Sequence, residues 1–279
     1  MDKTPACFPR RDFLRAIMAG AAGLSGLFLS GRGHALGETS RFHIALLRHP
    51  GNWNPRPGAV GALLEEIRSI TSIDARLTRQ YVSLNDPRMF NYPFVLLQSD
   101  AELPRLGRAE GNQLKRFLEL GGFMLVDNVG QTSPSAAMDR SLKQELARLF
   151  PGRALERIPA EHVIYRSFYR LDGPSGRLDA RPHLEGLELD GRYALVYSQN
   201  DLSGAWARDQ FGAWRYDLIP GTRDQRENAF RLGVNLAMYA LCLDYKDDHV
   251  HLDYLLKRRQ WRITPPSSDS SGHRRRRTR

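Results

Sequence analysis

Residues 92–128 read YPFVLLQSDAELPRLGRAEGNQLKRFLELGGFMLVDN, and this stretch decides the fold. Its first apolar run, Phe94–Leu97, is typical of a strand buried on both faces. Three apolar residues then share one face of a helix, at the i, i+3 and i+4 positions: Leu114, Phe117 and Leu118. Gly121-Gly122 favours the end of that helix, because glycine adopts the left-handed conformation of a C-terminal cap, and a second apolar run follows at Phe123–Val126. A strand, a helix and a strand in this order predict a right-handed crossover between parallel strands.

The segments on either side continue the alternation of strands and helices. Before the central stretch we expect a buried strand at Phe42–Leu47, a helix around Val60–Ile70 and a more exposed strand at Arg76–Leu84. After it we expect a helix around Met138–Leu149, a half-exposed strand at His162–Arg170, a β-hairpin at Leu184–Tyr197 that turns at Asp190-Gly191, and a last helix at about Arg223–Leu243. This order predicts one α/β domain over residues 40–256, with a three-layer, doubly wound and mostly parallel sheet.

The basic character of the chain lies in its two ends. The whole chain has a formal charge of +10, of which residues 1–35 contribute +3, residues 257–279 contribute +8, and residues 36–256 contribute −1. A neutral body argues against a nucleic-acid-binding fold. Residues 257–279 are rich in Pro, Ser and Arg. They predict a basic, partly disordered tail, which either associates with an anionic membrane surface or an acidic partner or is simply solvated.

Residues 1–35 have the anatomy of an export signal. Arg10-Arg11-Asp12-Phe13-Leu14 resembles the twin-arginine translocation motif, and Gly33-His34-Ala35 offers a small-x-small cleavage pattern. The apolar stretch between them, Ala16–Ser30, is shorter than the ~20 residues that span a bilayer. We therefore expect export by the twin-arginine pathway to the periplasm or cell envelope. Cleavage would remove Cys7 and leave Cys242, which we expect to be a small buried hydrophobe.

Several segments together resemble the domain-of-unknown-function 4159 family. They are Trp53–Pro57, Tyr92–Phe94, Gly121–Phe123, Glu161-His162, Asn200–Trp206, Arg231–Asn235 and Asp244–Lys246. The resemblance implies a flavodoxin-like sheet related to class I glutamine-amidotransferase folds, in a bacterial envelope setting beside von Willebrand-type and MoxR-type ATPase proteins. It implies no reaction. Where a glutamine amidotransferase has a glycine-flanked cysteine at a sharp turn, this chain has Leu97-Gln98-Ser99-Asp100.

Polar residues follow the expected carboxyl ends of the parallel strands, where open α/β sheets bind ligands. The candidate catalytic residues are Asp127, His162 and Asp201. Asp127 suits a base or metal ligand, with a cap of the next turn as the alternative; His162 suits a general base oriented by Asp127, with a structural histidine as the alternative. A triad of Ser99, His162 and Asp127 lacks the Gly-x-Ser-x-Gly context.

The candidate binding residues lie around the same edge. They are His49, Trp53, Ser99, Asn128, Asn200, Trp206 and Arg208. The segment from Asn200 to Arg208 has the composition of a binding loop, and a structural Asx-turn at Asn200-Asp201 is the alternative. We expect this edge to hold the main polar-lined pocket, with His162 on its wall.

The run Asp247-Asp248-His249-Val250-His251-Leu252-Asp253 invites a metal interpretation. His249, His251 and Asp253 would share a face in a strand but not in a helix. We assign no metal ligand, and no motif in the sequence identifies a cofactor.

Two functions are consistent with these patterns. The first is a non-catalytic envelope protein whose amidotransferase-like domain binds a ligand or a partner, which the absence of a nucleophile elbow favours. The second is a hydrolase that uses Asp127, His162 and Asp201, with or without a metal. Side chains within hydrogen-bonding reach of one another would favour the hydrolase, and separated side chains would favour binding.

Overall fold

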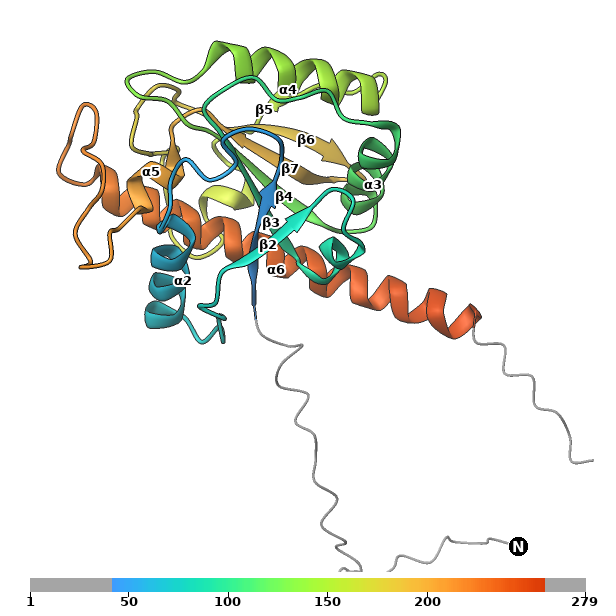
Figure 1. Cartoon of the computed structure of the whole chain (residues 1–279). Coiled ribbons are helices and arrows are strands. Elements are labelled where there is room, and N and C mark those ends of the chain that lie inside the picture. Colours follow the sequence, from blue (N-terminus) through green and yellow to red (C-terminus); the bar gives the residue numbers. More distant parts are fainter. Residues whose placement is uncertain (1–41, 259–279) are drawn as a thin grey trace, which may run out of the picture. The chain divides into compact units, whose positions relative to one another are not determined.

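The stretch that decides the fold lies at the centre of a seven-stranded sheet. The computed structural model describes residues 42–258, with side chains as far as Cys242. Within this range the strands follow the order β2-β1-β3-β4-β7-β6-β5 (Figure 1). Their bounds are β1 Ile44–Arg48, β2 Gln80–Ser83, β3 Phe94–Ser99, β4 Phe123–Asn128, β5 Glu156–Arg157, β6 Glu185–Leu189 and β7 Arg192–Ser198. The first five strands in this order pair in parallel, and β6 and β5 add an antiparallel edge.

The predicted crossover is confirmed. β3 and β4 pair in parallel along their whole length, and the helix between them is α3 (Arg108–Glu119). The two glycines after α3 are both needed: Gly121 has a φ of +105°, and a Cβ on Gly122 would lie 2.5 Å from the ring of Phe117. Glycine at both positions therefore lets the chain leave the helix and turn into β4.

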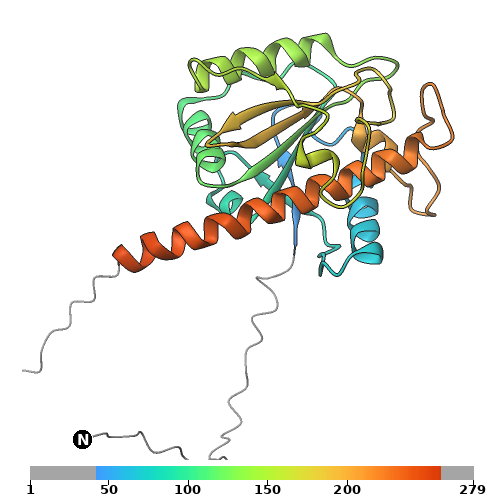
Figure 2. The same cartoon turned by 180° about the vertical axis from the view of Figure 1, so that it is seen from behind.

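Helices lie on both faces of the sheet (Figures 1 and 2). One face packs against α2 (Ala59–Ile70), α5 (Leu202–Trp206) and α6 (Gln225–Arg258), and the other against α3 and α4 (Ala136–Leu149). Successive side chains of a strand point to opposite faces, so each inner strand supplies both cores. Leu96 of β3 packs on the α6 side, and its neighbour Leu97 packs on the α4 side.

The remaining elements are short. η1 (Pro87–Asn91) and η2 (Val163–Tyr165) are single 3₁₀ turns. The predicted hairpin is confirmed: β6 and β7 are antiparallel, and Asp190 and Gly191 have φ of 52° and 77°. Positive φ at two central residues is the backbone that an Asp-Gly turn favours. None of the helices described between residues 42 and 258 is long and apolar enough to span a bilayer.

The expectation of a strand at His162–Arg170 is wrong. This segment contains η2 and then irregular chain. Its backbone bonds to α6 instead of to a neighbouring strand: the side-chain oxygen of Asn235 accepts from the N–H groups of Phe168 (3.1 Å) and Tyr169 (2.7 Å). Local alternation of apolar and polar residues could not reveal this long-range partner.

Three other expectations need correction. The strand expected at Arg76–Leu84 is only Gln80–Ser83, and Cys242 is exposed rather than buried. The last helix does not end near Leu243 but continues to Arg258, so the run 247–253 is helical and lacks the strand spacing that a metal site would need. The expected signal at residues 1–35, and all of the expected tail beyond Arg258, lie outside the described residues.

Candidate functional site

A buried group of charged and polar residues joins the loops at the carboxyl edge of the sheet. We call it the carboxyl-edge network; its members are Arg56, Asp127, Arg177, Asp201 and Ser203. As predicted, Asp127 and the segment from Asn200 to Trp206 lie together at this edge, because β4 and β7 are parallel neighbours.

Asp127, near the end of β4, caps a short helix. Its carboxylate is fully buried and accepts hydrogen bonds from the backbone N–H groups of Leu202 (3.0 Å) and Ser203 (2.8 Å). The hydroxyl of Ser203 donates a further, short bond to the same carboxylate. These are the free N–H groups of the first turn of α5, so the capping role considered from the sequence describes the observed contacts.

Asp201 has a different environment. It precedes α5 with φ of 50°, in the left-handed region, and its carboxylate accepts from the N–H of Gly204 at 3.0 Å. The guanidinium of Arg56 donates to both carboxylate oxygens, at 3.0 and 2.7 Å, and the Nε of Arg177 donates to one of them. One buried carboxylate is therefore paired with two buried cations through charge-assisted hydrogen bonds.

The two arginines also join separate loops. Arg56 lies in the loop after β1, and Arg177 lies between η2 and β6. Both donate to the carbonyl oxygen of Gly130, in the loop after β4. Neither arginine was predicted as a site residue, although Arg56 lies within the family-like segment Trp53–Pro57. Sequence alone gives no sign that two arginines so far apart meet at one aspartate.

Burial sets the protonation of Asp127. Desolvation raises the pKa of its carboxyl to about 6, and the nearby negative charge of Asp201 adds to the effect. The bonds from Ser203 and Leu202 act in the opposite direction. A carboxyl with a pKa near neutrality can act as a general base, but this one has no exposed surface, and its oxygens are occupied by the first turn of α5.

His162 does not join the network. Its ring lies 4.9 Å from the ring of Tyr193 and 5.6 Å from that of Tyr239. Tyr193 is at the start of β7, at the amino edge of the parallel strands, whereas Asp127 is at the carboxyl edge. His162 caps η2 through Nδ1, and burial followed by the charge of Arg166 lowers the pKa of its imidazole. The predicted pairing of His162 with Asp127, and a triad with Ser99, do not form.

Most of the predicted binding residues make bonds that support the fold. The hydroxyl of Ser99 donates to the carbonyl of Ala101, and the ring nitrogens of His49 lie 2.9 Å from the carbonyl oxygens of Pro50 and Gln98. Asn128 bonds to Ser135 and Tyr197; Asn200 bonds to Ala180 and Arg181; Trp206 is fully buried and donates to the carbonyl of Ala229. Trp53 packs against Tyr81, beside the guanidinium of Arg48.

Next to the carboxyl-edge network, the side-chain amide of Gln98 lacks hydrogen-bond partners among the described residues. Gln98 is fully buried, opposite Asp127 in the β3–β4 register, and neither of its amide atoms has a partner among the described residues.

Beside the network, a cleft of about 370 Å³ is lined by Arg56, Asp100 and residues 130–135. A larger polar hollow, of about 920 Å³, lies elsewhere, beside residues 208–215. The expectation that the main polar pocket lies at the carboxyl edge with His162 on its wall is therefore wrong.

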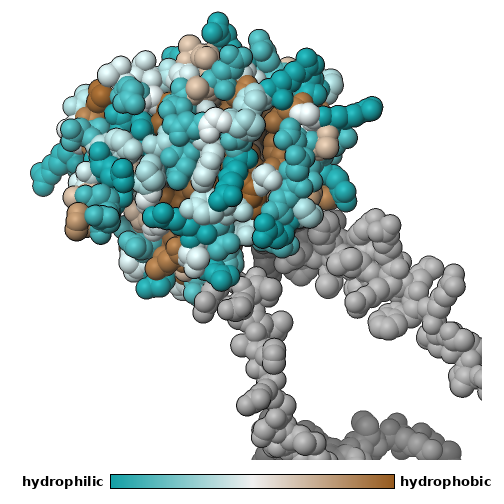
Figure 3. All heavy atoms as spheres, in the orientation of Figure 1, coloured by the Kyte–Doolittle hydropathy of each residue, from teal (hydrophilic) through white to brown (hydrophobic). Residues whose placement is uncertain are grey.

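Residues 208–215, which we call the arginine hairpin, hold the last predicted binding residue. Arg208 and Trp214 form an antiparallel bridge, and the loop that contains them extends away from α5 and the start of α6 (Figure 1). The guanidinium groups of Arg208 and Arg226 lie 4.2 and 4.3 Å from the Trp214 ring, a cation–π arrangement. Phe211 at the tip is 85% exposed. The other exposed large apolar side chains of the described part of the chain are 40–47% exposed, so Phe211 is the most exposed among them. The face drawn in Figure 3 is mostly hydrophilic, with apolar side chains scattered over it.

Comparison with known proteins gives a family but no activity. Residues 43–241 match the family described as "Domain of unknown function (DUF4159)". A search of curated proteins finds no match. The matched range includes every strand described between residues 42 and 258, the carboxyl-edge network and the arginine hairpin. This chain belongs to the DUF4159 family.

Proposed function

We propose that this chain is an exported, non-catalytic docking protein of the bacterial envelope, and that the arginine hairpin binds an acidic partner protein. One observation carries the proposal: Phe211 is 85% exposed at the tip of a hairpin whose conformation is fixed before any partner arrives. The buried carboxylates that could act in catalysis, Asp127 and Asp201, use their oxygens in hydrogen bonds that hold the fold together. Phe211, in contrast, belongs to neither hydrophobic core.

Two features hold the hairpin in place. The carboxylate of Asp209 accepts from the backbone N–H groups of Phe211 and Ala213, each at 2.9 Å, and so fixes the turn. At the base, Gly58 has a φ of +92°, and a Cβ there would lie 2.3 Å from the carbonyl oxygen of Arg208. A surface that is ordered in advance loses little conformational entropy when it binds.

The charge around the hairpin selects an acidic partner. Six arginines line the two hollows beside it: Arg79, Arg208, Arg215, Arg223, Arg226 and Arg231. The four acids of the same hollows are Glu65, Glu66, Asp209 and Glu227. Glu227 pairs with Arg231, and Asp209 keeps its charge while it accepts from the turn, so the six arginines exceed the four acids by two charges. Tryptophan, arginine and exposed aromatic residues are the usual anchors of protein interfaces, and an excess of positive charge guides the approach of a negative surface.

The setting of the proposal comes from the sequence. The twin-arginine signal supports export to the periplasm or envelope, and the family resemblance supports a partner of the von Willebrand type or of a MoxR-type ATPase system. The basic tail supports a second contact with an anionic membrane surface. The strand order β2-β1-β3-β4-β7, with helices on both faces, supports a flavodoxin-like domain related to class I glutamine amidotransferases.

Photo-crosslinking in cells tests the proposal. A photoreactive phenylalanine analogue replaces Phe211 in the full chain, and in a matched control it replaces Leu120, which is 44% exposed at the end of α3. We expect position 211 to crosslink to one acidic envelope protein and position 120 not to crosslink to it. With that partner purified, Phe211→Ala should weaken binding by about 30-fold, the effect of removing an interface anchor worth about 2 kcal/mol.

Two results would contradict docking through the hairpin. The first is equal crosslinking to the same protein from both positions. The second is unchanged affinity of Phe211→Ala for the purified partner in calorimetric titration. Arg215→Glu supplies a separate check, since it should slow association and reduce its dependence on salt while the fold stays intact.

A further inference from the structure

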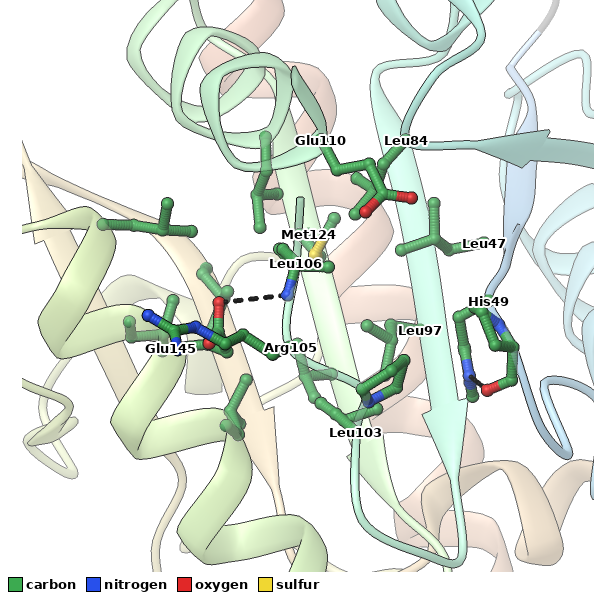
Figure 4. A pocket seen from close by; sticks show the side chains of 18 of the residues that line it. Leu47, His49, Leu84, Leu97, Leu103, Arg105, Leu106, Glu110, Met124 and Glu145 are labelled. Carbon is green, nitrogen blue, oxygen red and sulfur yellow. Dashed lines mark hydrogen bonds between the residues drawn. The ribbon is translucent and has the colours of Figure 1, made fainter. Parts of the chain in front are cut away.

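An apolar cavity of about 90 Å³ lies between the sheet and the layer formed by α3 and α4 (Figure 4). Its walls are mainly leucines, with Leu47, Leu97, Met124 and Val126 from the sheet and Leu142 and Leu146 from α4. On the sheet side, β1, β3, β4 and β7 all contribute lining residues. The cavity therefore lies between the face of the sheet and the helices α3 and α4 that cover it.

Residues 100–107, which we call the strap, cover the cavity. The strap contains no helix or strand. Its backbone is tied to α4 by side-chain acceptors: the N–H of Leu103 donates to the Ser141 hydroxyl at 2.9 Å, and that of Leu106 donates to Glu145 at 3.4 Å, the bond drawn in Figure 4. Segments held by a few exposed or half-exposed bonds open locally at much lower free energy than the core. The strap is thus joined to α4 by few backbone bonds, and its half-buried Leu103 and Leu106 pack against the core.

Charged residues at the mouth of the cavity leave an excess of positive charge. The charged side chains that line it are Arg48, Arg105, Glu110 and Glu145, and Glu145 pairs with Arg148 at 2.6 Å, so three positive groups face two negative ones. Arg105 is exposed at the same mouth and forms no ion pair within the described range 42–258. An anionic group is therefore favoured where the cavity opens to solvent.

We propose that the cavity binds the alkyl end of a short-chain carboxylate, with the carboxylate at the mouth beside Arg105. The apolar walls fit a chain of hydrocarbon, and the volume of about 90 Å³ equals about three water molecules at ~30 Å³ each. That space accepts an alkyl group of about three to five carbons. Each methylene that enters an apolar cavity strengthens binding about fourfold, so affinity should rise with chain length until the cavity is full. This site is independent of docking at the arginine hairpin.

Two methionines make the test specific. Met124 lines the cavity, whereas Met89 is equally buried in the same core but lies outside it. The full chain, with carbon-13 in its methionine methyl groups, is titrated with straight-chain carboxylates from acetate to octanoate. We expect the Met124 methyl resonance to shift saturably, with affinity rising to about butanoate or pentanoate and levelling off beyond. The Met89 resonance should stay in place.

Two variants separate the alkyl contact from the charge. Arg105→Gln alters an exposed side chain, so folding is retained, and it should weaken pentanoate about fivefold but leave pentanol unchanged. Leu146→Ala enlarges the cavity and should move the best chain length upward. Absence of any Met124 shift, or shifts of Met124 and Met89 together, would overturn the alkyl site. Equal effects of Arg105→Gln on pentanoate and pentanol would overturn the placement of the carboxylate.

Discussion

Asp127 and Asp201 lie close together at the carboxyl edge, yet their carboxylates have different partners. Asp201 is paired with two guanidinium groups, and Asp127 meets only the neutral donors of Leu202 and Ser203. A buried carboxylate without a counter-ion favours its protonated form, because the charged form loses its hydration. The lack of a counter-ion explains why burial raises the pKa of Asp127 to about 6. It also makes Asp127 a source of pH-dependent stability.

Asp127→Asn is the prediction at the residue scale. The folded-state pKa of Asp127, about 6, is above its ordinary value of 3.8, so the folded protein holds a proton that the unfolded chain releases between these values. Stability from this group is therefore present at low pH and is lost as the pH rises through about 6. The Asn variant has no such proton. At about 1.4 kcal/mol per pKa unit, the difference in unfolding free energy between wild type and variant should change by on the order of 2–3 kcal/mol between pH 4 and pH 7.

Urea denaturation at a series of pH values measures this difference. Asp100→Asn is the matched control, since Asp100 is an exposed carboxylate at the same edge of the sheet. Parallel pH profiles for wild type and Asp127→Asn would show that the carboxyl is not desolvated as the structure describes it.

Short elements at the carboxyl edge depend on contacts from distant parts of the chain. α5 has five residues, too few to be stable alone, and it is held by the carboxylates of Asp127 and Asp201 at its N-terminus. The arginine hairpin that follows α5 is held against Gly58, just before α2. Both elements are thus positioned by tertiary contacts that precede any binding event.

Gly58→Ala is the prediction at the element scale. The new Cβ would meet the Arg208 carbonyl oxygen at 2.3 Å, at a residue with φ of +92°, so the base of the hairpin must move. We expect a loss of about 1–3 kcal/mol in stability and faster hydrogen exchange over residues 208–215.

Gly61→Ala is the control: nothing lies within 4 Å of its Cβ position inside α2. It should stabilise the protein by about 0.5–1 kcal/mol, because alanine favours the helix. Equal exchange rates for the hairpin in the two variants would refute the proposed clamp.

At the scale of the whole molecule, the basic charge and the folded domain lie in different parts of the chain. The folded body is close to neutral, and the excess of basic residues lies in the two ends. Our proposal follows this distribution: the ends address and attach the protein, and a local surface of the body contacts the partner. The arginine hairpin is the surface that we propose, within an otherwise balanced domain.

Export is the prediction at this scale. Replacement of Arg10 and Arg11 by lysine keeps the positive charge but removes the twin-arginine motif. We expect the variant to remain in the cytoplasm as full-length protein, whereas the wild type reaches the periplasm when the general secretion pathway is blocked. Cell fractionation and immunoblotting measure the distribution. Unchanged periplasmic yield of the double variant under the same block would rule out the twin-arginine route.

The sequence by itself determined the α/β class, the parallel β3–α3–β4 unit, the hairpin turn at Asp190-Gly191 and the family. These features are local: apolar runs, helical spacing and glycine turns each act within a few residues, so they can be read from the chain. It also predicted that Asp127 and the segment from Asn200 to Trp206 meet, because parallel strands end at one edge.

Only the tertiary structure decided what those residues do. The pairing of Asp201 with Arg56 and Arg177 joins residues 145 and 24 positions apart, and no periodicity encodes such a contact. The placement of His162 at the opposite edge follows from the bonds that Asn235 of α6 makes to Phe168 and Tyr169 in place of a strand ladder. Burial likewise has a tertiary cause, and it is burial that raises the pKa of Asp127. Polar residues that suggest catalysis in a sequence become structural when the fold surrounds them with donors and excludes water.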